Sequence, residues 1–213
     1  MYYYKEGGMR FEDFLKHPDT MFILDKESKK VLLSLEGLPK DHERFIHSMS
    51  LINYNIALLE AEGWKFISGK YDIIPIDFCS ASSEKYSIFF DDKYTVLVKT
   101  SDKLKDLYKK IKETPLDKLI LEESVEAAGS VSEYGDIIDY KGDFTDEEIK
   151  IFDSIVNTND ILFKLQADML SVVSGLIWYP LLGWFIKGKE HTLCSSLGKW
   201  AVIKSESFRE YIR

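Results

Sequence analysis

The chain has few of the residues that support several common kinds of protein chemistry. It contains two cysteines, Cys79 and Cys194, and four histidines among its 213 residues. Two cysteines do not form the disulfide framework of a small secreted domain, and they favour the reduced cytosol. No spacing of His, Cys and acidic residues predicts a metal site, and no glycine-rich loop predicts a phosphate site. We therefore expect a cytoplasmic protein without a metal or a cofactor.

An excess of basic residues is also lacking. The 28 Lys and Arg residues stand against 36 Asp and Glu residues, which gives a formal net charge of −8. Binding to nucleic acid depends on clustered Lys and Arg that neutralise phosphates, so we expect no nucleic-acid partner. The first residues, MYYYKEGGMRFEDF, carry charge where a signal peptide would be apolar.

Long apolar runs are scarce, and one of them could be a membrane span. Residues 169–186, MLSVVSGLIWYPLLGWFI, contain no charged residue and reach the lower length limit of a transmembrane helix. Pro180, Gly175 and Gly183 instead suit a helix, a turn and a second short helix. The flanks also lack the basic cluster that would set an orientation. We expect a buried core segment, with a membrane-associated protein as the less favoured alternative.

The chain does contain enough apolar and aromatic residues for a large core. Hydrophobic residues make up 45% of it and aromatic residues 14%, which fits one large domain or two small ones. We expect a single α+β domain over residues 1–213. A weak boundary near 65–70 would separate an N-terminal subdomain, residues 1–68, from a core, residues 69–213. No internal repeat is visible in the sequence.

Alternation of apolar residues and turn signals predict strands in the first two thirds of the chain. The expected strands are residues 21–25, 29–37, 70–78, 85–92, 93–100 and 135–140. Residues 88–90 and 95–98 are expected to pair as a hairpin, and Pro75 makes its strand an edge strand or an interrupted one. Residues 116–130 could be either strand or helix. An antiparallel sheet built from residues 71–99, with helices packed on it, is therefore the expected architecture.

Helices are predicted from spacing and capping signals. Their expected positions are residues 11–15 (a helix start), 41–62, 104–111, 145–155 and 161–177. In the second of these, Phe45, Met49, Ile52, Ile56 and Leu59 are expected to form one buried face. Thr145 and Glu148 have the spacing of a capping box.

A further helix is expected to begin near Cys194, within TLCSSLGKWAV. A thiol at a helix N-terminus faces unpaired backbone N–H groups and the positive end of the helix dipole, and both favour the thiolate. A cysteine nucleophile is formed in this way. Cys194 is therefore the candidate nucleophile, and a small buried core thiol is the competing interpretation.

Three motifs follow one another in residues 134–206: GDIIDYKGDFTDEEIKIF, WYPLLGWFIKG and TLCSSLGKWAV. Their order resembles that of the circularly permuted papain-like hydrolases of bacteria and phages. In that family a strand, an acidic helix and an aromatic stretch precede a catalytic Cys-Ser-Glu helix start. The resemblance places Cys194 at the family's nucleophile. It implies a papain-like (permuted) core over residues 69–213.

Two positions depart from the family's pattern. Ser196 stands where the family usually has an acidic residue, and residues 94–99, which would carry the catalytic histidine, contain none. A cysteine nucleophile needs a base within hydrogen-bond reach. His191 precedes Cys194 by three positions and is the candidate base, with a surface histidine as the alternative. The remaining histidines are His17, His42 and His47.

Two functions remain open at this stage. The first is a papain-like cysteine hydrolase, or a degenerate member of that fold, that acts on amide or thioester bonds through Cys194. The second is a non-enzymatic protein-binding accessory factor of bacterial or phage origin. Both functions imply a protein or peptide-like substrate or partner.

Overall fold

The computed structural model describes residues 15–16, 19–33, 40–132, 134–175, 177–208 and 210–212. Apart from Leu15, the helix start expected at residues 11–15 lies outside these ranges. His17 and the side chain of His42 are outside them as well.

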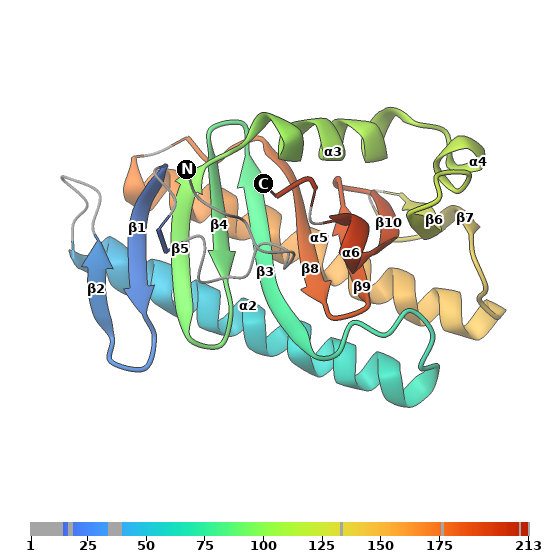
Figure 1. The fold of residues 1–213 in the computed structure, drawn as a ribbon, viewed down its shortest axis with the longest axis horizontal. Coiled ribbons are helices and arrows are strands. Elements are labelled where there is room, and N and C mark those ends of the chain that lie inside the picture. The colour runs from blue at the N-terminus through green and yellow to red at the C-terminus, as the bar shows by residue number, and fades with distance from the viewer. Residues whose placement is uncertain are drawn as a thin grey trace, which may run out of the picture.

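The first half of the chain forms a β-β-α-β-β-β-α unit (Figure 1). Its elements are β1 (Thr20–Asp25), β2 (Lys30–Leu33), α2 (Lys40–Ile67), β3 (Ile76–Ser83), β4 (Tyr86–Phe90), β5 (Tyr94–Lys99) and α3 (Asp102–Glu113). The expected hairpin is confirmed, because Ile88 pairs with Leu97 across β4 and β5. Ser101 caps α3 by accepting a hydrogen bond from the backbone N–H of Leu104.

The second half repeats this order of strands and helices after one short helix. Its elements are α4 (Leu116–Leu119), β6 (Val125–Val131), β7 (Ile137–Lys141), α5 (Asp146–Ser174), β8 (Leu181–Gly188), β9 (His191–Ser195), β10 (Lys199–Lys204) and α6 (Ser205–Phe208). Thr145 and Glu148 form the expected capping box at the start of α5. The side chain of each accepts a hydrogen bond from the other's backbone N–H.

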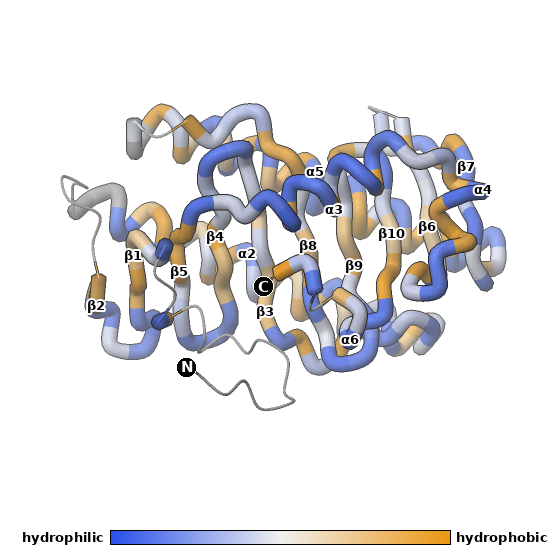
Figure 2. Tube along the Cα trace, turned by 45° about the horizontal axis from the view of Figure 1, so that its top comes forward, coloured by the Kyte–Doolittle hydropathy of each residue, from blue (hydrophilic) through white to orange (hydrophobic). Residues whose placement is uncertain are grey.

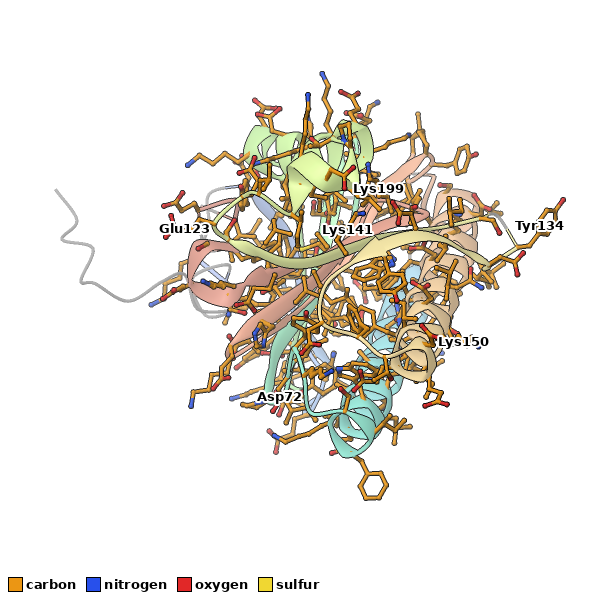
Figure 3. All side chains as sticks on the ribbon, turned by 90° about the vertical axis from the view of Figure 1, so that its right-hand side faces the viewer. Asp72, Glu123, Tyr134, Lys141, Lys150 and Lys199 are labelled. Carbon is orange, nitrogen blue, oxygen red and sulfur yellow. The ribbon has the colours of Figure 1, made fainter. Side chains whose placement is uncertain are left out.

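The ten strands of the described residues belong to one antiparallel sheet, in the order β2-β1-β5-β4-β3-β8-β9-β10-β6-β7. The long helices α2 and α5 lie along one face of the sheet, and α3 crosses the other face (Figure 1). The view along the sheet in Figure 3 shows the same three layers. The expected α+β fold, an antiparallel sheet with helices packed on it, is confirmed.

The two halves of the sheet are related by a topological repeat that the sequence does not reveal. Read from each edge to the centre, the orders β2-β1-β5-β4-β3 and β7-β6-β10-β9-β8 are equivalent. Strands β8, β9 and β10 each begin 105 positions after their counterparts, as Leu181 does after Ile76. Pro75 and Pro180, both preceded by cis peptide bonds, occupy equivalent positions just before β3 and β8. The subdomain boundary expected near residue 68 falls between α2 and β3, inside the first unit.

Pro75 does not make its strand an edge strand. It precedes β3, and β3 pairs with β4 on one side and with β8 on the other. The edge-strand alternative is therefore wrong. The run expected as a strand over residues 70–78 is interrupted at the proline, since β3 begins only at Ile76, and the proline removes no donor from the ladder.

The sheet separates two apolar cores. One core lies between the sheet and helices α2 and α5, and the other lies between the sheet and helices α3, α4 and α6. Successive side chains of a strand point to opposite faces, so both faces of the central strands are buried. In Figure 2 these strands accordingly carry hydrophobic stretches.

The expectation that the last third of the chain is helical is wrong beyond α5. Residues 181–188, 191–195 and 199–204 are strands, and Cys194 lies inside β9 rather than at a helix start. A strand that is buried on both faces reads as a continuous apolar run, which periodicity cannot distinguish from a buried helix. For this reason the apolar runs WYPLLGWFI and LCSSLGKWAVI suggested helices, although they contain residues of strands β8, β9 and β10.

The candidate membrane segment is divided between three structures. Residues 169–174 end α5, a connection containing Pro180 follows, and residues 181–186 belong to β8. Among the described residues, no helix is long and apolar enough to cross a membrane.

The close approach of β8 to its neighbours gives a first prediction. A Cβ added at Gly183 would lie 2.2 Å from the backbone oxygen of Ser195 and 2.4 Å from the ring of Tyr108, whereas Gly63 on α2 has nothing within 4 Å. We expect Gly183→Ala to lower the free energy of unfolding by about 1–3 kcal/mol or more through overpacking. Gly63→Ala should raise it by about 0.5–1 kcal/mol through helix propensity. Urea unfolding of both variants measures this, and equal effects would contradict the packing of β8.

Candidate functional site

Cys194 does not lie in the environment that the helix-start interpretation requires. It is fully buried near the end of β9, among residues of the core beneath α3 and α6. Burial raises the pKa of its thiol well above the ordinary value. Cys194 is not at the N-terminus of a helix, since β9 continues into a turn that leads to β10. The thiolate is therefore disfavoured rather than stabilised.

His191 and Cys194 lie on opposite faces of the sheet. Leu193, between them, belongs to the core beneath α2 and α5, and alternation along β9 places His191 on that same side. Both ring nitrogens of His191 already contact oxygen atoms. Nε2 lies 2.7 Å from a carboxylate oxygen of Glu126, and Nδ1 lies 3.0 Å from the backbone oxygen of Asp72. The structure does not bring the two candidate residues together.

The other described histidine and cysteine do not complete such a site. His47 lies on α2, and burial lowers the pKa of its imidazole. Cys79 is fully buried on β3, and burial raises its pKa above the usual range. Within the described ranges, no cluster of three or more His, Cys, Asp or Glu side chains could hold a metal ion.

Thiol labelling gives the second prediction. We expect neither Cys79 nor Cys194 to react with iodoacetamide at neutral pH in the native protein, because both are buried and their pKa values are raised. Mass spectrometry after native and denaturing labelling measures this for each cysteine. Native labelling of Cys194 that is much faster than global unfolding would contradict its burial and would support Cys194 as a nucleophile.

The polar groups with the most unusual surroundings lie instead between α5 and the sheet. Asp160 is 2% exposed, and its carboxylate accepts three hydrogen bonds. The donors are the indole Nε1 of Trp184 at 2.6 Å, the Ser195 hydroxyl at 2.7 Å and the backbone N–H of Gly198 at 2.7 Å. One side chain therefore joins α5 to β8, to β9 and to the turn before β10.

A second buried carboxylate lies two turns earlier on α5. Asp153 accepts a hydrogen bond from the indole Nε1 of Trp200 at 2.8 Å, while its Oδ2 atom has no hydrogen-bond partner in the described structure. Burial raises its pKa from 3.8 to about 6.

Two equivalent polar pairs join α2 to α5. Asn53 and Gln166 exchange hydrogen bonds between their side-chain amides, and Asn159 donates to Glu60 at 2.5 Å. Asn53 and Asn159 each lie 13 positions after the first residue of their helix, and Glu60 and Gln166 each lie 20 positions after it. The helices are therefore antiparallel, and the topological repeat extends to their contacts. Burial raises the pKa of Glu60 to about 7, against the opposing effect of the Asn159 donor.

The inward face of α2 differs from the expected one. Its buried residues include the small or polar Ser50, Asn53, Ala57 and Ala61 and the larger Ile46, Met49 and Trp64, whereas Ile52 and Leu59 are exposed. The expectation of a buried face through Ile52 and Leu59 is wrong because α5 packs against α2 as well as the sheet does. Small side chains such as Ala57 allow that close approach, and Ile52 and Leu59 point outward.

Exposed apolar side chains lie on both of these neighbouring helices, and we call this set of side chains the apolar helix face. It consists of Leu51, Ile52, Leu59, Phe66 and Ile67 on α2 and Ile161, Leu165, Met169 and Val172 on α5. Phe66 is 92% exposed and Val172 is 85% exposed. Exposed apolar side chains that gather on one side of a soluble protein mark interaction sites.

The charged side chains around the apolar helix face balance each other. Among the described side chains of α2 and α5, the exposed charged residues are four basic ones and four acidic ones: Arg44, Lys65, Lys150, Lys164, Glu62, Asp146, Glu147 and Asp168. The chain as a whole has a net charge of −8. The exposed charges of these described residues therefore cancel one another on an acidic protein. Figure 3 shows Lys150 on the outer side of α5.

The fold and the site together define a three-layer α+β protein with an exposed apolar helix face. Residues 115–210 match the model of a family described as "Uncharacterized conserved protein (DUF2173)". This match spans the second topological unit, from α4 to α6, and is less than half of the chain. No curated protein and no solved structure matches the chain.

The resemblance to permuted papain-like hydrolases is wrong. The matching family is a different one, and no papain-like structure is similar to the chain. The motif order was misleading because TLCSSLGKWAV contains a strand, a tight turn and the start of another strand, not the start of a catalytic helix.

Proposed function

We propose that this protein is a non-enzymatic protein-binding module whose binding surface is the apolar helix face. The observation that supports the proposal is the exposure of large apolar side chains on α2. Ile52, Leu59 and Phe66 face solvent, although the helix also buries a core face that includes Met49 and Trp64. Exposing such side chains is unfavourable by roughly 25 cal/mol per Å² of apolar surface, so a function that covers them explains their position.

The surroundings of the two cysteines support a non-enzymatic role. Cys194 and His191 are separated by the sheet, and both thiols are buried with raised pKa values. A cysteine nucleophile needs a base within reach. The apolar helix face needs only a partner of complementary shape.

Capture from a cleared cell extract tests the proposal. Three tagged baits are compared after crosslinking: the wild type, a Leu59→Asp/Leu165→Asp variant, and Leu121→Asp as a matched control. Leu121 is 82% exposed and lies between α4 and β6, away from α2 and α5. The proposal expects proteins that the wild type and the control retain and that the helix variant loses. The same set of proteins on all three baits would contradict it.

A further inference from the structure

We propose that the apolar helix face binds a second copy of this chain, so that the α2 and α5 helices of two copies pack face to face. This inference rests on the proposed function and names its partner. The contact would be isologous, with the same surface contributed by each copy, as is usual in homodimers.

The repeat within the chain makes this face suited to a symmetric contact. Leu59 and Leu165 each lie 19 positions after the start of their helix, and Phe66 and Val172 each lie 26 positions after it. All four are more than half exposed. Because α2 and α5 are antiparallel, these equivalent residues are related by a local two-fold axis that passes between the helices. A face with such an axis can meet its own copy in two equivalent orientations.

The charge distribution also favours a second copy. Two copies with a net charge of −8 each repel one another over most of their surfaces. Among the side chains of α2 and α5 that the structure describes, the exposed charges sum to zero, so like-charge repulsion between two copies is weaker at this face. A partner that binds through its own basic residues would instead favour an acidic docking face on this chain.

The size of the face matches what a stable dimer needs. The two helices contain 28 and 29 residues, so each is about 42 Å long at 1.5 Å per residue, and two helices side by side are about 20 Å wide. Their outer surface is therefore roughly 800 Å², close to the area that each partner buries in a standard interface.

Sedimentation equilibrium of the full-length protein tests this inference. Protein concentrations from about 1 μM to about 100 μM cover the Kd values of weak and moderately stable dimers. The wild type should show twice the chain mass of 24.7 kDa at the upper concentrations. Leu59→Asp/Leu165→Asp should raise the dimer Kd by more than about 100-fold, because each of the two copies would bury two like charges at the centre of the contact. Leu121→Asp should leave the Kd unchanged.

The replaced side chains are 68% exposed at Leu59 and 56% exposed at Leu165, so the variant should keep its fold, and circular dichroism verifies this. A wild type that is monomeric at every concentration would overturn the inference. So would a dimer that persists in the helix variant, or a dimer that Leu121→Asp disrupts equally. Failure of the proposed function would give a different result from failure of this inference. The capture experiment would then show no protein, neither a second copy nor another chain, whose binding depends on the apolar helix face.

Discussion

The Asp160→Ala variant is expected to lose about 3–5 kcal/mol of its free energy of unfolding. Its carboxylate accepts hydrogen bonds from Trp184, Ser195 and Gly198. Without it, an indole N–H, a hydroxyl and a backbone N–H would remain buried without an acceptor. Urea unfolding followed by tryptophan fluorescence measures the loss.

Ser195→Ala is the matched control for this prediction. It removes one of the three donors to Asp160 and leaves the other two in place, so we expect a loss of about 1 kcal/mol. If Asp160→Ala cost no more than Ser195→Ala, the role of Asp160 as the junction between α5 and the sheet would be wrong.

Glu60→Gln is expected to become more stable than the wild type as the pH rises from about 5 to about 8. Burial raises the pKa of Glu60 from 4.5 to about 7. The folded protein therefore binds this proton more tightly than the unfolded chain does. The resulting stabilisation is complete below pH 4.5 and is lost as the pH rises through 7. Glutamine keeps the neutral form at every pH, and because Glu60 is partly exposed we expect a gain of about 1–3 kcal/mol at pH 8.

The reverse change on the partner helix provides the control. Gln166 occupies the position equivalent to Glu60 and pairs with Asn53 as Glu60 pairs with Asn159. Gln166→Glu should make stability more dependent on pH, whereas Glu60→Gln should make it less dependent. Asp153 and His47 also contribute to the pH dependence of stability. Comparison with the wild type removes their contributions, because all three proteins contain both residues. Parallel stability curves from pH 5 to pH 8 would contradict the pairing of the two helices.

Local signals in the sequence identified the elements whose patterns arise from one buried face. The hairpin at Ile88 and Leu97 and the capping box at Thr145 were predictable because turn residues and capping side chains act over a few positions. Strands β8 to β10 were not predictable in this way. Both of their faces are buried, so they show no alternation that would separate them from a helix.

The internal repeat could not be recognised from residue identities. Equivalent positions hold different residues, such as Phe89 and Cys194 or Thr95 and Trp200. What the halves share is the length and order of their elements and the 105-residue shift between equivalent strands. Fold geometry depends on burial and strand length, and many side chains satisfy both requirements.

The candidate site was missed for a related reason. Ile52 and Leu59 have the spacing of a buried helical face, and spacing does not state which side of a helix is covered. Asn53, Ala57 and Ala61 on the opposite side were the available signal, since small residues allow two helices to approach closely. That signal indicates a helix–helix contact only once the partner helix is known.

The presence of both halves in one polypeptide allows them to diverge. In an assembly of two identical subunits, each substitution changes two equivalent contacts at once. Here the Asn53–Gln166 contact has two neutral side chains, while the equivalent Asn159–Glu60 contact includes a carboxyl group that can gain or lose a proton. A single chain can therefore keep one helix contact insensitive to pH and make the other responsive, which a symmetric pair of separate subunits cannot do.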